Sequence, residues 1–141
     1  MRAFLDTSVL VAAFYGDHAH HAASLDLLTG FPKKDAFCGA HSLVEVYATL
    51  TRMPGKHRVN PEQAMLFISD LKERLTVVGL TPEETLEMLQ THADNGVAGG
   101  TTYDGVLAAC ALKAGAQRLF TWNTRHYAQL GAAVNKLLRT P

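Results

Sequence analysis

Four polar residues follow or open segments that are otherwise apolar, and three of them carry carboxylates. Asp6 comes directly after a short apolar run, and Asn123 follows another. Glu45 and Asp104 lie in the first turns of segments with helical spacing of apolar residues. Gathered carboxylates repel one another unless a cation holds them, and their oxygens suit Mg²⁺ or Mn²⁺. The chemistry that these residue types favour is metal-assisted hydrolysis of a phosphodiester bond.

Each of these residues also has an ordinary structural interpretation. Asp6 is a good helix cap, and the pattern Thr101-x-x-Asp104 resembles a capping box. The helical spacing of Glu45 places it on a polar face, which favours an exposed position. Asn123 suits a turn or a helix cap. Both interpretations stay open for each residue, so the elements that position them must decide.

Apolar runs and helical periodicity alternate along the chain. Buried strands are predicted at residues 3–5, 36–40, 75–80 and 118–122, with a weak C-terminal strand near 132–134. Helices are predicted to begin at residue 9 and to occupy 18–28, 41–53, 61–74, 81–94 and 101–115, with Thr101 as a cap. This alternation predicts one α/β domain over residues 1–141: a three-layer α/β/α sandwich whose central sheet has about five mostly parallel strands.

A parallel sheet of this kind places its ligands at the carboxyl ends of its strands. Asp6 and Asn123 each follow a strand, and Glu45 begins a helix that follows one. Asp104 heads the apolar stripe of its helix, the side expected to face the sheet. All four side chains are therefore expected at one edge of the sheet.

The composition is that of an ordinary globular chain. It has 141 residues, 48% hydrophobic and 18% charged, with 13 basic and 13 acidic residues and a formal net charge of zero. No overall basic character marks a binder of polyanions, so such a site has to be a local patch.

The two cysteines, Cys38 and Cys110, lie in apolar segments and are expected to be free thiols of a reducing compartment. Asp6 interrupts the N-terminal apolar run, so no signal peptide is expected, and no stretch is long enough to span a membrane. A cytoplasmic location is expected.

The segment DHAHH offers a second metal-site hypothesis. Asp17, His18 and His21 can share a helix face, but no other residues complete a tetrahedral zinc site. An exposed helix start is the favoured interpretation. His20 or Tyr15 is expected to line the groove near Asp6.

Phosphoaspartyl hydrolases also place an aspartate after the first strand, where it acts as the nucleophile. They usually carry a second acid two residues on, and this chain has Ser8 there. That alternative is therefore weak.

With these residues in hand, the chain resembles PIN-domain nucleases and, more narrowly, the VapC-type toxins of bacterial toxin–antitoxin pairs. The matching stretches are FLDTSVLVAAF, SLVEVYATLTR, TTYDGVLAACALKAGA and RLFTWNTRHY, in an order and spacing that extend over essentially the whole chain. The resemblance implies a metal-dependent endoribonuclease that uses Mg²⁺ or Mn²⁺, forms a homodimer and is held inactive by a cognate antitoxin.

The resemblance also assigns roles to single residues. Asp6, Glu45 and Asp104 become metal-site carboxylates, with Asn123 as the fourth catalytic position. Many relatives carry aspartate where this chain has Asn123, which removes one charge and puts a second metal in doubt. The hydroxyls expected to support the site by hydrogen bonds belong to Thr7, Ser8 and Thr121.

Basic side chains near this edge could contact the phosphates of an RNA, and a solvated surface is their alternative. The candidates are Arg52, Lys56, Arg58 and Arg125. Apolar residues such as Phe14, Tyr15 or Phe67 are candidates for a dimer contact. The alternative to an enzyme is a catalytically inert PIN-like scaffold that binds RNA or protein. Such a scaffold would be signalled by loss of the acids, of which three remain.

Overall fold

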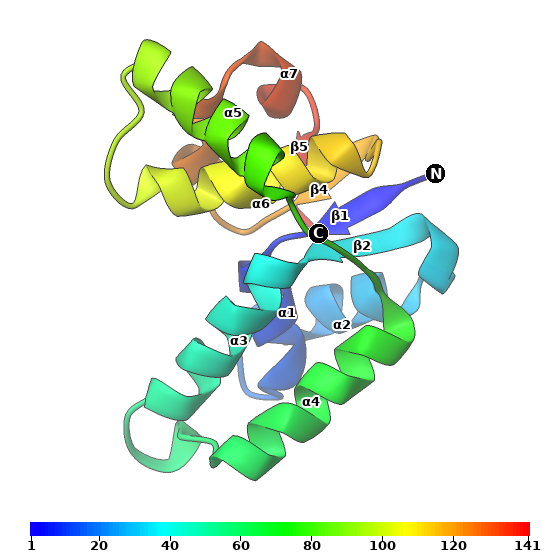
Figure 1. Ribbon diagram of the computed structural model, residues 1–141. Coiled ribbons are helices and arrows are strands. Elements are labelled where there is room, and N and C mark those ends of the chain that lie inside the picture. Colours follow the sequence, from blue (N-terminus) through cyan, green and yellow to red (C-terminus); the bar gives the residue numbers. More distant parts are fainter.

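The computed structural model describes all residues of the chain, 1–141, and has a five-stranded sheet at its centre (Figure 1). The strands are β1 (Ala3–Leu5), β2 (Ala36–Gly39), β3 (Thr76–Val78), β4 (Arg118–Phe120) and β5 (Leu138–Arg139). Their order across the sheet is β3-β2-β1-β4-β5, and every neighbouring pair is parallel. The predicted sheet of about five mostly parallel strands is confirmed.

Helices connect the strands, as parallel pairing requires. They are α1 (Thr7–Phe14), α2 (His21–Thr29), α3 (Ala40–Arg52), α4 (Pro61–Arg74), α5 (Pro82–Asp94), α6 (Thr101–Lys113) and α7 (Ala132–Asn135). Short 3₁₀ segments are η1 (Lys33–Asp35), η2 (Gly55–His57) and η3 (Thr124–Leu130). None of the helices combines the length and the apolar character needed to cross a bilayer.

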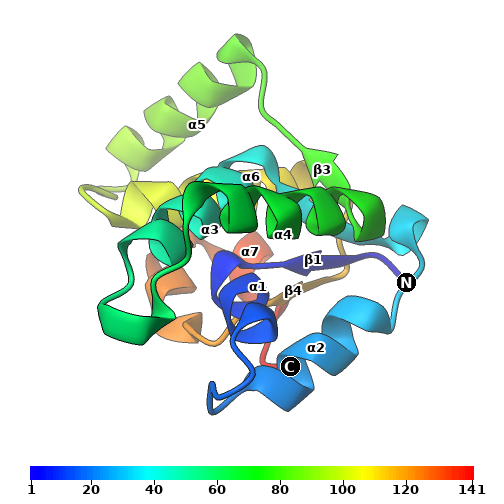
Figure 2. The same cartoon turned by 90° about the horizontal axis from the view of Figure 1, so that it is seen from below.

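Two apolar clusters lie on the two faces of the sheet, because successive strand residues point to opposite sides. Ala3 and Leu5 belong to the cluster with α1 to α4, whereas Phe4 belongs to the cluster with α6, η3 and α7. Figure 1 shows α1 to α4 on one side of the sheet and α5 to α7 on the other. Figure 2 views the molecule from the side of α1, α2 and α4. The three layers follow from this alternation.

β1 lies between β2 and β4, so its carboxyl end is flanked by the ends of both neighbours. Phe4 pairs in register with Phe37 of β2 and Leu119 of β4. The main-chain N–H of Asp6 donates to the carbonyl of Phe120 at 2.9 Å, which continues this register to the end of the strand. The residue after β1 therefore lies at the centre of the carboxyl edge.

The C-terminal strand was predicted at the wrong place. Residues 132–134 lie in the helix α7, and the fifth strand is Leu138–Arg139. Gly131 has φ +95°, a left-handed conformation that suits glycine, and the two alanines that follow it favour a helix. A strand of two residues carries no periodicity that the sequence alone could reveal.

One other expectation is corrected, and a second remains open. Thr101 is the first residue of α6 and not its cap, since Gly100 takes the cap position without a side-chain bond. Phe14, Tyr15 and Phe67 pack against one another within the chain, with ring centroids 4.9 Å apart in each contacting pair. Phe14 and Phe67 stay partly exposed, so a dimer contact through these residues remains a prediction.

Candidate active site

Asp6 occupies the position that the sequence assigns to it, directly after β1. Its side chain is only 4% exposed, and it caps α1 by accepting the main-chain N–H of Ser8 at 3.2 Å. The cap interpretation of Asp6 is therefore confirmed, and it is compatible with a place in the site. The cap fixes one carboxylate oxygen and leaves the other, Oδ1, for a different partner.

Hydroxyl groups from three parts of the chain orient the Asp6 carboxylate. Ser8 donates to Oδ2 at 2.7 Å and Thr121 donates to the same oxygen at 2.9 Å. Tyr127, which is fully buried in η3, donates to Oδ1 at 2.6 Å. Short bonds from hydroxyl to carboxylate are among the stronger hydrogen bonds of proteins. The Asp6 side chain thus has a fixed orientation in a nearly buried position.

Tyr127 is the member of this network that sequence reasoning missed. It stands in the stretch RLFTWNTRHY but lies beyond the strand that the apolar run predicts. Burial raises the pKa of Tyr127 first, and the Asp6 charge together with the hydrogen bond raises it further. The hydroxyl therefore keeps its proton and acts only as a donor to Asp6.

Glu45 lies in the second turn of α3 with its side chain 33% exposed. Thr7 donates a hydrogen bond to its Oε1 at 2.9 Å, and Nε2 of His41 lies 4.0 Å from its Oε2. The polar face of α3 thus borders the groove, and Glu45 is both partly exposed and part of the groove wall. The helical periodicity identified the face correctly but not what lies opposite it.

Asp104 lies in the first turn of α6, and its side chain is 24% exposed. Burial, followed by the negative charges of Asp6 and Glu45, raises the pKa of Asp104 to about 6. Nδ1 of His126 lies 3.9 Å from Oδ2 of Asp104 and acts in the opposite direction on the pKa. The electrostatics of the site therefore couple Asp104 to both other carboxylates.

These acids share one groove of about 640 Å³. Asn123 also lines it, as does Arg52, which is the only lysine or arginine in its wall. The residues that complete the lining are Asp6, Thr7, Ser8, Val11, His18, His20, Glu45, Thr49, Asp104, Trp122 and His126. The structure therefore brings together all four residues predicted as catalytic, three of them negatively charged carboxylates when ionised.

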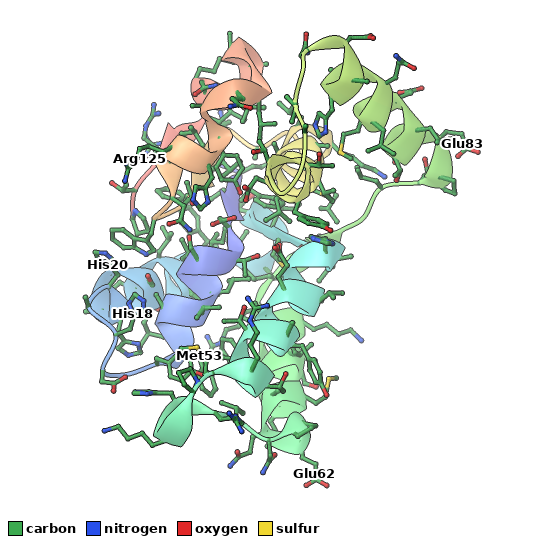
Figure 3. The ribbon with its side chains drawn as sticks, turned by 90° about the vertical axis from the view of Figure 1, so that its left-hand side faces the viewer. His18, His20, Met53, Glu62, Glu83 and Arg125 are labelled. Carbon is green, nitrogen blue, oxygen red and sulfur yellow. The ribbon has the colours of Figure 1, made fainter.

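The other basic candidates lie outside this wall. Lys56 and Arg58 lie in and directly after η2, where Nε of Arg58 donates to the carbonyl of Met53 at 3.0 Å. Arg125 is exposed on η3, two residues beyond Asn123 (Figure 3). Their part in binding a polyanion stays a prediction.

The histidine-rich segment has no set of ligands for zinc. Asp17 pairs with Nε2 of His57 at 2.8 Å, and Nδ1 of His21 lies 3.0 Å from the carbonyl of Ala12. Nδ1 of His18 accepts the main-chain N–H of His20 at 3.0 Å. These side chains are engaged locally, and only His18 and His20 reach the groove.

The donor set fits a hydrated divalent cation. Nowhere do three or more His, Cys, Asp or Glu side chains come close enough to hold one metal directly. Mg²⁺, however, keeps several waters and is bound through one or two carboxylates. Three carboxylates line this groove, and Arg52 is the only lysine or arginine that lines it with them. Hard oxygen donors with unbalanced charge are what such an ion requires.

Comparison with known protein families places this geometry in context. The family model described as PIN domain matches residues 3–131. Ribonuclease VapC40 of Mycobacterium tuberculosis H37Rv is 33% identical over 114 residues, which cover 81% of each chain. Ribonuclease VapC27 of the same strain is 31% identical over 108 residues, covering 76% of this chain and 74% of VapC27.

Solved structures share the fold. The crystal structure of the sarcin–ricin-loop-cleaving toxin VapC20 of Mycobacterium tuberculosis has a TM-score of 0.71 at 19% identity, covering 89% of this chain and 93% of that one. VapBC2 from Rickettsia felis, bound to a fragment of its promoter DNA, has a TM-score of 0.67 at 18% identity, covering 99% and 98%. The architecture of sheet and helices is thus one that these toxins use.

Proposed function

This chain belongs to the PIN domain family, and on that premise we propose that it is a divalent-metal-dependent endoribonuclease, the toxin of a toxin–antitoxin pair. Its sequence relatives VapC40 and VapC27 are named ribonucleases and match this chain over three quarters of its length or more. The reaction is hydrolysis of a phosphodiester bond within RNA.

One observation carries this proposal: Asp6, Glu45 and Asp104 line the same groove although they come from three separate segments of the chain. Such a gathering opposes ionisation, because burial and then the negative charges of Asp6 and Glu45 raise the pKa of Asp104. A carboxyl with a raised pKa in a groove that holds two further acids favours a catalytic or metal-binding role. In an inert scaffold, the three acids of the groove would have no function.

The residues of the groove have separable roles in this proposal. Asp6 is the fixed carboxylate, oriented by Ser8, Thr121 and Tyr127. Asp104, with a pKa of about 6, is the carboxyl whose charge state responds to the arrival of a cation. Thr7 orients Glu45, the most exposed of the three acids, through its hydroxyl.

We propose Mg²⁺ or Mn²⁺ as the cation, with Asp6, Glu45 and Asp104 as its protein ligands, directly or through water. When bound, such an ion polarises the phosphate, lowers the pKa of a bound water and stabilises the leaving oxygen. Asn123 supplies a neutral amide at the fourth position, so the site is proposed to hold one tightly bound ion.

The partners follow from the function. A cognate antitoxin is the expected regulator, and the VapBC proteins from Rickettsia felis and Salmonella typhimurium share this fold. A homodimer stays a prediction, for which large exposed apolar side chains on the helices, Val44, Leu66 and Leu86 among them, offer contact area. A cytoplasmic location is proposed, consistent with the two free, buried thiols of Cys38 and Cys110.

The test is cleavage of total cellular RNA by purified protein with Mn²⁺, with the 5′ ends of the fragments mapped. Asp6→Asn keeps the shape of the side chain but removes its charge, and we expect it to fold normally and to lose RNA cleavage and growth inhibition. Asp26→Asn is the matched control, because Asp26 is an exposed aspartate of α2 outside the groove.

Undiminished cleavage by Asp6→Asn would contradict the mechanism. Binding of RNA without cleavage by the parent protein, with Mg²⁺ and with Mn²⁺, would instead favour the inert scaffold. Circular dichroism of both variants separates loss of the site from loss of the fold.

A further inference from the structure

A pair of stacked rings forms part of the groove wall beside the carboxylates. The imidazole of His20 lies on the indole of Trp122 with ring centroids 3.7 Å apart and an angle of 9° between the planes. Both residues line the groove together with Asp6 and Asp104. His20 precedes α2 and makes no side-chain cap bond there, so capping does not explain its position.

Trp122 is held in place from two directions. Its main-chain N–H donates to Oγ of Ser8 at 3.0 Å, and its indole N–H donates to Oγ of Ser24 at 2.9 Å. Ser24 is completely buried in α2, so it is a rigid acceptor. The hydroxyl of Ser8 in turn donates to Asp6 at 2.7 Å. The Ser8 hydroxyl therefore connects the main chain of Trp122 to the Asp6 carboxylate. The indole ring has a fixed position relative to that carboxylate.

The imidazole of His20 is exposed, whereas Trp122 is partly buried against the core under α1 to α4. The His18 ring lies 5.8 Å from that of His20, tilted by 43°, and the two are neighbours in Figure 3. A flat, exposed ring supported by a fixed second ring is a surface on which another flat ring can stack. Unpaired nucleobases bind proteins in this way, on aromatic side chains beside a backbone-binding groove.

We infer that the His20–Trp122 pair is a stacking platform for an unpaired nucleobase next to the phosphate that the carboxylates address. This inference rests on the proposed ribonuclease function and adds a requirement to it: the RNA must be single-stranded at the groove. Ser24 is a positioning residue of the platform, since it acts only through the indole. A base-paired strand keeps its rings inside the duplex and cannot use the platform.

The chain offers a direct probe, because Trp122 is its only tryptophan. We expect a short single-stranded oligoadenylate, added in EDTA so that no cleavage occurs, to quench the fluorescence of Trp122. His20→Ala should weaken binding by about 5- to 10-fold, the lower part of the range for base stacking on a side chain. Ser24→Ala should lower the amplitude of quenching, because the indole loses its fixed position. A duplex of the same length should quench little.

Tyr103→Ala is the matched control. Tyr103 is an exposed aromatic residue stacked on a histidine, with its centroid 5.7 Å from that of His41 and an interplanar angle of 6°, but it does not line the groove. Its loss should leave the fluorescence change and the RNA affinity as in the parent protein. An equal loss of affinity for His20→Ala and Tyr103→Ala would overturn the assignment to the His20–Trp122 pair.

Cleavage assays separate this inference from the proposed function. If the parent cleaves RNA and His20→Ala changes neither the Michaelis constant nor the preferred cut positions, the platform is refuted while the ribonuclease stands. Trp122→Leu, followed by filter binding, tests the second ring, and a thermal melt checks its fold. An effect of His20→Ala on binding of the antitoxin alone would make the pair a protein contact and also refute the platform.

Discussion

The hydroxyl of Tyr127 donates a 2.6 Å hydrogen bond to Oδ1 of Asp6, which joins two residues 121 positions apart in the sequence. With Ser8 and Thr121 on Oδ2, this bond gives each oxygen of the carboxylate a donor inside the protein. Both oxygens of the nearly buried Asp6 carboxylate are therefore hydrogen-bonded, which lowers the cost of burying it. The orientation of the central acid thus depends on a residue far outside the first strand.

Tyr127→Phe removes this hydroxyl and nothing else of the ring. We expect a loss of about 1–3 kcal/mol of stability, because a buried carboxylate oxygen loses its donor, and a fall in RNA cleavage of about 10-fold or more. Thermal unfolding and initial cleavage rates measure the two effects.

Tyr15→Phe is the control for Tyr127→Phe, because the Tyr15 hydroxyl makes a comparable 2.7 Å bond to the carbonyl of His57. Its loss should lower stability and leave the turnover number unchanged. Equal turnover in Tyr127→Phe and the parent would show that the Asp6 orientation does not need Tyr127.

The raised pKa of Asp104 predicts how stability depends on pH without metal. The pKa is about 6 in the folded protein against an ordinary value of 3.8, so the folded state binds this proton more tightly than the unfolded state. The stability that the proton contributes is fully present below pH 3.8 and is lost as pH rises through 6. A shift of this size corresponds to on the order of 2–3 kcal/mol.

Asp104→Asn lacks this proton, so above pH 6 it should be more stable than the parent in EDTA. Urea unfolding of both proteins over a pH series measures the difference, and Mn²⁺ should stabilise the parent more than the variant. If the free energies of unfolding of the two proteins changed with pH in parallel, the raised pKa of Asp104 would be contradicted.

Gly105, next to Asp104, allows α5 to dock on α6. A Cβ at this position would overlap the imidazole of His92, which is buried and whose Nδ1 has no hydrogen-bond partner. We expect Gly105→Ala to cost about 1–3 kcal/mol of stability through overpacking, and to lower RNA cleavage by displacing the start of α6.

Replacing His92 as well removes the obstacle. The double variant Gly105→Ala/His92→Ala should therefore be more stable than the sum of the single losses predicts, as measured by urea unfolding. Strictly additive losses would mean that the two residues do not oppose each other in solution.

Arg52 is the only lysine or arginine of the groove wall, so we expect it to contact a phosphate. Each phosphate contact on a single strand contributes about 0.7 to the slope of log affinity against log salt. Arg52→Ala should lower that slope by about this amount, whereas Lys72→Ala, an exposed lysine of α4 outside the groove, should leave it unchanged. Filter binding over a salt series distinguishes the two variants.

Much of the architecture could be predicted because apolar runs and helical periodicity report burial directly. The edge that gathers Asp6, Glu45, Asp104 and Asn123 follows from the alternation of strands and helices, and the groove indeed holds all four. The two-residue strand β5 could not be found, because its pairing with β4 depends on contacts distant in sequence.

The supporting contacts were only partly predictable. Ser8 and Thr121 adjoin strands that were recognised, so their place near Asp6 was expected. The Tyr127–Asp6 hydrogen bond and the His20–Trp122 stack involve irregular segments that are distant in sequence. Local sequence patterns carry no information about such tertiary contacts. The polar face of α3 was identified, but periodicity cannot tell a solvent-facing stripe from a groove wall.

The position of β1 between β2 and β4 has a consequence for the synthesis of the protein. Chains fold as they leave the ribosome, starting from the N-terminus. Asp6 is synthesised 115 residues before Thr121 and 121 residues before Tyr127, whose hydroxyls orient it. A growing chain therefore contains Asp6 long before the hydroxyls that orient its carboxylate are present. For an enzyme that cleaves RNA, the oriented central carboxylate is therefore complete only after Tyr127 has left the ribosome.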